Sequence, residues 1–272
     1  DRAGAFSSSE SVVFSPYGVA MAHYDFNAPR LFVEAPLSEG ARIPLDRAQA
    51  NYLLNVLRLK AEDAVLVFNG RDGEWRAAVA VEGRKAADLV CVARTREQTR
   101  PLDLIYAFAP LKHARLDYMV QKAVEMGAGA LQPILTRRTQ ATRVNLERMR
   151  SNAVEAAEQC GILDLPEVRE EVDFAKFVSG LEEDRLVVFC DEDAPIANPV
   201  EALRKAAGEG WNKPAKFSVV VGPEGGFIDQ ERAIVAAHER CIRVSLGPRI
   251  LRADTAAVAA LAVVQSVLGD WA

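Results

Sequence analysis

Two glycine loops near the carboxyl end of the chain, each directly after an apolar run, constrain the fold more than any other feature. Residues 217–221 form the first run and precede Gly-Pro-Glu-Gly-Gly-Phe, while residues 241–246 form the second and precede Gly-Pro-Arg-Ile-Leu-Arg. Short runs rich in Val, Ile and Phe that stop at Gly-Pro are typical of buried strands ending in a turn. The sequence therefore predicts two strands whose carboxyl ends carry glycine loops.

The two loops are suited to binding a small molecule. In an open parallel sheet, ligands bind in the crevice beyond the carboxyl ends of the strands. Glycine lets backbone groups approach a ligand closely, and proline stiffens a loop by fixing φ. We expect the loops of these consecutive strands to lie side by side and to bind a ligand mainly through backbone groups. The alternative is a pair of ordinary strand-to-helix turns; the presence of two such loops, with arginines in the second, favours a site.

Residues 30–98 have the pattern of a small β-rich domain. Short apolar runs predict strands at Ala64–Phe68, at Glu74–Val81 and at residues 87–92. The Asn-Gly-Arg-Asp-Gly stretch at residues 69–73 predicts a hairpin turn between the first two strands. Residues 47–57 predict one helix, and the charged residues 94–100, closed by Pro101, predict a linker.

After Pro101 the pattern changes to alternating strands and helices. Strands are predicted at residues 102–109, 130–135, 186–190, 217–221 and 241–246. Helices are predicted at residues 116–126, at 146–156 with Asn145 as N-cap, at 199–207, at 229–239 and from 255 to 268. Five such units indicate an α/β fold, a parallel sheet with helices on both faces.

Several classes of protein do not fit this sequence. No run of eighteen apolar residues exists, so no membrane span is expected, and residues 1–28 are interpreted as an extension or a cloning remnant and not a signal peptide. The cysteines Cys91, Cys160, Cys190 and Cys241 lack metal-site spacing and are typical of reduced core cysteines in a cytoplasmic protein. The three histidines are scattered, so no metal site is expected. The sequence also lacks a G-x-G-x-x-G after its first α/β strand and a P-loop.

Charge is distributed unevenly along the chain. The formal net charge is −5, yet residues 101–150 contain eight Lys and Arg against four Asp and Glu, a local charge of +4. A basic stretch on an acidic protein can bind RNA, although a solvated helix face explains it equally well.

The two glycine loops resemble the signature stretches of a known family. Gly222-Pro223-Glu224-Gly225-Gly226-Phe227 and the stretch from Leu246 to Ala256 are similar to those of the ribosomal RNA small subunit methyltransferase E family, which belongs to the knotted SPOUT class of S-adenosylmethionine-dependent RNA methyltransferases. Residues 51–58 also resemble the family, as do residues 112–127 and 155–159. The chain departs from the family pattern at Asp254, where Glu is usual, and at Ile162, where Arg is usual.

This resemblance implies a two-domain α/β fold. It places a small PUA-like, RNA-binding β-barrel at residues 29–98 and a parallel-sheet SPOUT methyltransferase domain with a C-terminal trefoil knot at residues 101–272. The implied cofactor is S-adenosyl-L-methionine. Its implied binding residues are Gly222, Pro223, Glu224, Gly225, Gly226, Leu246, Gly247, Ile250, Leu251, Arg252, Thr255 and Ala256. The implied RNA-binding residues are Arg30, Arg58, Lys112, Arg115, Lys122, Arg137 and Arg138.

The resemblance also implies a reaction, methylation of N3 of uridine 1498 in 16S rRNA. Because N3 of uracil carries a proton, the site needs a base or a cation that stabilises the uracil anion. Arg249 and Arg252 are the candidate cations, and Glu224 and Asp254 are the candidate bases. Three structural roles compete with these: Asp254 as cap of the last helix, Glu224 as support of its loop, and Arg252 as ion-pair partner of Asp254. A different RNA target, such as tRNA or 23S rRNA, and a non-catalytic RNA-binding scaffold stay open as alternatives.

The last predicted helix indicates how the protein assembles. Residues 255–268 contain no charge and are apolar nearly all round, so the helix is buried on several sides. Burial under the helix at residues 116–126 of the same chain is one explanation. Dimerisation through this region, which the resemblance implies, is the one we expect. The expected partners are thus 16S rRNA or the small ribosomal subunit and a second copy of the chain, in the cytoplasm.

Overall fold

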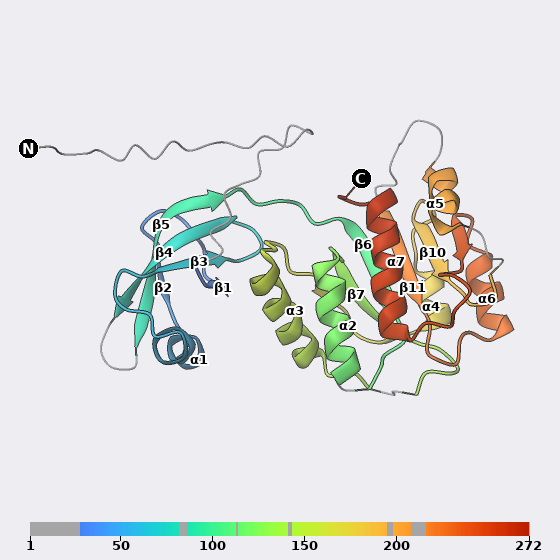
Figure 1. Ribbon diagram of the computed structural model, residues 1–272, viewed down its shortest axis with the longest axis horizontal. Coiled ribbons are helices and arrows are strands. Elements are labelled where there is room, and N and C mark those ends of the chain that lie inside the picture. The colour runs from blue at the N-terminus through green and yellow to red at the C-terminus, as the bar shows by residue number, and fades with distance from the viewer. Residues whose placement is uncertain are drawn as a thin grey trace, which may run out of the picture.

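The structure, a computed structural model, describes residues 28–81, 86–112, 114–140, 143–194, 198–207 and 216–271. These residues build two sheets, one in each half of the molecule, and a single connection leads from the first sheet to the second (Figure 1). All but the last residue of the expected N-terminal extension lie outside the described residues.

The first sheet has five strands in the order β1-β3-β4-β5-β2. They are β1 (Arg30–Phe32), β2 (Arg42–Pro44), β3 (Ala64–Phe68), β4 (Glu74–Val81) and β5 (Ala87–Arg96). The expected hairpin joins β3 to β4, because the Asn69 side chain accepts hydrogen bonds from the N–H groups of Arg71 and Asp72. Within the described residues no pairing joins β1 to β2, so the expected barrel is seen as a sheet that hydrogen bonds do not close.

Two local predictions in this half were confirmed only in part. The single helix expected at residues 47–57 is α1 (Arg47–Asn51) followed by a π-helical turn, η1 (Tyr52–Val56). The charged residues taken as a linker begin inside β5, which runs on to Arg96 because that side chain pairs with Glu74 of β4. Charge alone therefore did not mark the end of the domain.

The second sheet has seven strands, and every pairing in it is parallel. Its order is β12-β10-β11-β6-β7-β8, with β9 also paired to β7. The strands are β6 (Asp103–Phe108), β7 (Ala130–Leu135), β8 (Glu167–Val168), β9 (Val172–Asp173), β10 (Leu186–Cys190), β11 (Lys216–Val221) and β12 (Cys241–Val244). The predicted mixed α/β class with a parallel sheet is confirmed.

Helices cover both faces of this sheet (Figure 1). They are α2 (Ala114–Glu125), α3 (Leu146–Cys160), α4 (Phe174–Ser179), α5 (Pro199–Ala207), α6 (Asp229–Ala236) and α7 (Ala253–Val267). One core holds buried residues of α2, α3, α5 and α7, and a second core on the opposite face holds those of α4 and α6. The predicted cap of α3 is confirmed, since the Asn145 side chain accepts from the N–H of Arg148.

The two glycine loops come together as expected, although their strands are not neighbours. Both loops line one pocket, while β10 lies between β11 and β12 and pairs with both. The sequence reading also missed β8, β9 and α4, because their runs are too short to show a period. None of the described helices combines the length and the apolar character that a bilayer span requires.

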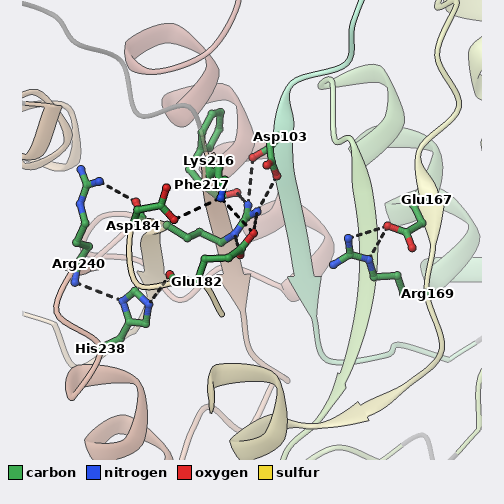
Figure 2. A network of polar contacts seen from close by, with 10 residues as sticks. Asp103, Glu167, Arg169, Glu182, Asp184, Lys216, Phe217, His238 and Arg240 are labelled. Carbon is green, nitrogen blue, oxygen red and sulfur yellow. Dashed lines mark hydrogen bonds and ion pairs between the residues drawn. The ribbon is translucent and has the colours of Figure 1, made fainter. Parts of the chain in front are cut away.

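A buried arginine ties together the amino ends of the central strands. Arg185 donates to the backbone carbonyls of Asp103 and Phe217 and pairs with the carboxylates of Asp103 and Glu182. Figure 2 shows this network, with Lys216 beside Asp184 and, farther along the sheet, the Glu167–Arg169 pair at β8. The charged network thus lies at the amino ends of the strands, and the glycine loops lie at the carboxyl ends. The carboxyl edge of the sheet is therefore the one available to a ligand.

Candidate cofactor pocket

A pocket of about 290 Å³ lies at the carboxyl ends of β10, β11 and β12. Three loops enclose it, one after each strand, and the first turn of α7 closes one side. Its lining is Cys190, Asp191, Glu192, Val221, Gly222, Pro223, Glu224, Gly225, Ser245, Leu246, Gly247, Pro248, Arg249, Ile250, Leu251, Ala253 and Ala256. The volume is near the lower end of the roughly 300–1,000 Å³ that is usual for small-molecule sites.

The first glycine loop is shaped by the core beneath it. Phe227 is fully buried and packs against Phe174 and Phe189, so the chain must return into the core directly after the loop. An added Cβ at Gly222 would lie 2.5 Å from the Phe227 ring, which explains the need for glycine there. Gly226 closes the turn by donating to the Pro223 carbonyl, at a φ of 69°.

The second glycine loop presents its side chains to solvent. Gly247 has a φ of 110°, and the Ser245 hydroxyl donates to its carbonyl. Beyond Pro248, Arg249 is exposed and Ile250 is 95% exposed.

Sequence reasoning missed the third loop, which follows β10. Asp191 is buried and accepts hydrogen bonds from Arg232 of α6 and Arg243 of β12. Burial raises the pKa of its carboxyl, but the hydrogen bonds from the two arginines outweigh that effect and hold the pKa below its usual range. The available signal was the Asp-Glu-Asp stretch directly after the predicted strand at residues 186–190.

The carboxylates of this third loop lie close enough together to hold a metal ion in principle. Asp191, Glu192 and Asp193 have carboxylate oxygens within 4.8 Å of one another. Arg232 pairs with all three of them, at distances of 3.1, 3.2 and 2.6 Å. A guanidinium therefore already supplies the positive charge at this place.

One arginine of α2 joins two walls of the pocket. Arg115 pairs with Glu224 of the first glycine loop, Nη1 to Oε1 at 2.6 Å, and with Asp254 of α7, Nε to Oδ2 at 3.1 Å. The hydrogen bond from Arg115 lowers the pKa of Asp254 more than burial raises it.

These contacts bear on two of the structural alternatives. The N-cap residue of α7 is Arg252 and not Asp254, although the Asp254 carboxylate accepts from the N–H of Thr255 in the first turn. Asp254 pairs with Arg115 and not with Arg252. Among the carboxylate roles considered, support of the loop fits Glu224.

Most residues predicted to bind the cofactor line this pocket. Those that do are Gly222, Pro223, Glu224, Gly225, Leu246, Gly247, Ile250, Leu251 and Ala256. Gly226, Arg252 and Thr255 belong to the same loops and the start of α7 but do not line the cavity. Of the candidate catalytic residues, Arg249 and Glu224 line it, and Arg252 is exposed at the N-cap of α7.

The predicted RNA-binding residues differ in exposure and in their partners. Arg58, Lys112, Arg137 and Arg138 are exposed. Arg138 donates to the Gly225 carbonyl at 2.5 Å. Lys122 pairs with Glu125 on the same helix.

Arg30 is a correction to the predicted RNA-binding set. It is buried and donates to Glu74 and to the carbonyls of Ala157, Glu158 and Ile162 at the end of α3. Its guanidinium therefore faces the interior, and it serves the junction between the two halves of the chain.

The chemistry of the pocket fits a cofactor that is bound without covalent attachment. Backbone groups of two glycine loops reach the cavity, and the Glu192 and Glu224 carboxylates at its wall are paired with Arg232 and Arg115. Cys190 also lines it, but burial raises the pKa of its thiol to about 12, so it stays protonated and is a poor nucleophile. S-Adenosylmethionine, whose adenosine and methionine parts offer polar groups to backbone N–H and C=O groups, fits such a pocket.

Comparison with known proteins agrees with this geometry. Residues 98–265 match the RNA methyltransferase domain family, and residues 45–91 match the RNA methyltransferase PUA domain family. The chain is 34% identical over 246 residues to ribosomal RNA small subunit methyltransferase E of Synechocystis, covering 89% of this chain and 78% of the relative. It is 28% identical over 237 residues to the protein of the same name from Rickettsia conorii, covering 87% of this chain and 94% of the relative.

Two solved structures have the same fold. The ribosomal RNA small subunit methyltransferase E of Neisseria gonorrhoeae, bound to S-adenosyl methionine, has a TM-score of 0.76 and 25% identity, over 90% of this chain and all of that one. A Legionella pneumophila methyltransferase with bound SAM has a TM-score of 0.75 and 26% identity, and the match covers 88% of this chain and 97% of that one. The five-stranded half of this chain is therefore a PUA-like domain, and the chain belongs to the ribosomal RNA small subunit methyltransferase E family, the S-adenosylmethionine-dependent rRNA methyltransferases.

Proposed function

We propose that this enzyme transfers a methyl group from S-adenosylmethionine, bound in the pocket at the ends of β10, β11 and β12, to N3 of uridine 1498 in 16S rRNA. The observation that carries the proposal is the state of the charged groups at the pocket. Arg249 and Arg252 are exposed, and within the described residues neither forms an ion pair, whereas Glu224 and Asp254 are both paired with Arg115. The site thus has two arginines that are available to a substrate anion, while the two candidate bases, Glu224 and Asp254, are held in ion pairs.

This arrangement favours stabilisation of a uracil anion over removal of the proton by a carboxylate. The cofactor supplies an electrophilic methyl group, and N3 can attack it only after losing its proton. Guanidinium groups near the uracil carbonyl oxygens lower the free energy of the anion, so the proton can pass to solvent. Arg249, on the pocket wall, and Arg252, at its rim, are the proposed anion-stabilising residues, and Glu224 is proposed to hold its loop.

RNA binding is proposed to use exposed cations beside the pocket together with the PUA-like domain. Lys112 precedes α2 and Arg137 follows β7, and both side chains are exposed. Arg58 lies on the PUA-like domain, at the end of η1, also exposed. Phosphate contacts from such residues position the RNA without reading its sequence.

The enzyme is proposed to work as a homodimer through the outer face of α7. Thr255, Val258, Ala259, Ala262, Val263 and Ser266 keep partial or full exposure along this helix and form an uncharged stripe. Small residues on such a stripe allow a second copy to approach closely, and an uncovered apolar helix face marks an interface.

Three further parts of the proposal follow from the family. The domains are placed at residues 29–98 and 101–272, which the division into two sheets supports. The second domain is proposed to carry the SPOUT trefoil knot. Because the proposed substrate is ribosomal RNA, the enzyme is placed in the cytoplasm.

The test is to map the methyl group. Small subunits or 16S rRNA lacking the modification are incubated with the enzyme and isotopically labelled S-adenosylmethionine, and digested fragments are analysed by mass. Label on N3 of uridine 1498 is expected, and Arg249→Met should reduce the rate by about two orders of magnitude, as loss of one anion-stabilising donor does. Arg169→Met, on the opposite edge of the sheet (Figure 2), serves as control. Label on another nucleotide, or on tRNA or 23S rRNA alone, would replace the proposed target.

A further inference from the structure

The first glycine loop is held from outside by two arginines that come from distant parts of the chain. Arg115 of α2 pairs with Glu224 at 2.6 Å. Arg138, in the segment after β7, donates to the Gly225 carbonyl at 2.5 Å, and its side chain packs over the Cα of that glycine. Both bonds attach to adjacent residues of the loop that lines the pocket.

Arg115 also reaches the other side of the pocket. Its Nε and Nη2 donate to the two carboxylate oxygens of Asp254, at 3.1 and 3.3 Å, in the first turn of α7. That turn directly follows the second glycine loop. A single guanidinium therefore connects the two loops that enclose the pocket, which the planar, multiply donating group of arginine can do and the point charge of lysine does less well.

We propose that Arg115 and Arg138 are positioning residues that fix the geometry of the S-adenosylmethionine pocket. The sequence suggested both as RNA contacts, but the donors that the structure shows in use point at the pocket loops. The inference rests on the proposed binding of the cofactor in this pocket and not on which nucleotide is methylated.

The energetic effect is expected in cofactor affinity and not in global stability. Ion pairs that are partly exposed contribute about 0–1 kcal/mol to folding, so removing one leaves the core in place. The glycine loop, however, has few bonds of its own, and a loop that must be ordered on binding lowers affinity. Loss of Arg115 is expected to raise the dissociation constant of the cofactor about tenfold, and loss of Arg138 about threefold.

The experiment measures S-adenosylmethionine binding by calorimetry without RNA, so that a phosphate contact cannot affect the result. Arg115→Met and Arg138→Met are compared with Arg148→Met. Arg148 is the matched control, because it also forms a partly exposed ion pair at 2.6 Å from one helix to another, with Asp117, away from the pocket loops. Amide hydrogen exchange of residues 222–227 and 246–252 is followed in the same samples.

For Arg115→Met and Arg138→Met we expect weaker cofactor binding, faster amide exchange in both loops and an unchanged Tm. Arg148→Met should behave like the wild type. Arg115→Lys should recover part of the cofactor affinity that Arg115→Met loses. If Arg115→Met does not fold, Asp254→Asn decides, because it weakens one attachment at a residue that does not line the pocket and leaves the pair with Glu224. Cofactor affinity within twofold of wild type in the folded variants would overturn the proposal. Failure of the proposed function would appear separately, as label on another nucleotide with the wild-type enzyme.

Discussion

Arg30 of β1 and Glu74 of β4 form an ion pair of 2.8 Å in which the two side chains are only 2% and 3% exposed. Glu74 also accepts from Arg96, and Arg30 lies 4.4 Å from the centre of the Phe68 ring. Arg30 and Arg96 both donate to backbone carbonyls at the end of α3. Because the last carbonyls of a helix lack partners within it and carry partial negative charge, these arginines attach the PUA-like domain to the methyltransferase domain.

Replacing Glu74 by Gln is expected to reduce the free energy of unfolding by about 3–5 kcal/mol, because two arginines would lose the carboxylate that compensates their burial. Burial raises the pKa of Glu74, but the hydrogen bonds from Arg96 and Arg30 outweigh burial and leave the pKa below its usual value. The Glu74 carboxylate is therefore charged in the folded protein. Urea denaturation checks the value. Asp88→Asn, which breaks a pair with an Arg42 that is 55% exposed, is the control and should change stability by under about 1 kcal/mol. Equal effects of the two variants would contradict this role.

The pH dependence of stability should contain a contribution from Glu182. The hydrogen bond from Arg185 lowers the pKa of Glu182 from 4.5 to about 2. Since the folded pKa lies below the unfolded one, this contribution is present above pH 4.5 and is lost as the pH falls toward 2. Because the side chain is 45% exposed, its size is expected to be about 1 kcal/mol at most. Thermal unfolding of wild type and Glu182→Gln between pH 5 and 2.5 should show the two converging at low pH; a constant difference would argue against it.

The two glycines of the first loop should respond differently to alanine. At Gly222 an added Cβ would meet the fully buried Phe227 ring at 2.5 Å, so Gly222→Ala should destabilise the fold by about 1–3 kcal/mol. At Gly225 the nearest atom is in the Arg138 side chain, at 3.3 Å, which can move outward. Gly225→Ala should therefore fold normally, and the larger Gly225→Val should fold while losing cofactor binding. Chemical denaturation and calorimetry of the three variants test the order.

The assembly can be tested on the outer face of α7. Light scattering should give about twice the chain mass of 29.7 kDa, and Val258→Glu should reduce the mass to that of one chain without unfolding it. Leu261 is fully buried within its own chain, so a charge there would unfold the protein and would not report on a dimer. Val56→Glu, at an exposed valine of the PUA-like domain, is the control for added charge. A wild-type monomer with full activity at micromolar concentration would refute the dimer.

RNA affinity should fall steeply with salt if exposed cations contact phosphates. Each of Lys112→Ala and Arg137→Ala is expected to reduce the slope of log affinity against log salt concentration by about 1, because each removes one released counterion. Fluorescence anisotropy with a labelled 16S fragment at several salt concentrations gives the slope. Lys176→Ala, at an exposed lysine of α4 near Arg185 on the opposite edge of the sheet, removes the same single charge and is the control. An affinity that does not change with salt concentration would show that these cations do not contact RNA phosphates.

The sequence by itself determined the local structure and the identity of the loops. Apolar runs of regular period and their glycine and proline ends depend on nearby residues, so strands such as Ala64–Phe68 and Leu186–Cys190 were predicted with their full bounds. The same local signals placed most of the pocket lining in two short stretches. Resemblance to a family rested on these stretches, because a glycine loop that must approach a ligand tolerates few changes.

Only the tertiary structure decided how those pieces meet. The insertion of β10 between β11 and β12 brought Asp191 and Glu192 into the pocket, and no local pattern encodes which strands become neighbours. Likewise, Arg30 and Arg115 were predicted to contact RNA, but in the fold they pair with carboxylates far away in the chain. Glu74 is 44 residues from Arg30, and Glu224 is 109 residues from Arg115. Whether an arginine is buried in an ion pair or offered to RNA depends on which carboxylates and carbonyls the fold places within about 3 Å of it, and that is fixed by packing between elements and not by the residues on either side.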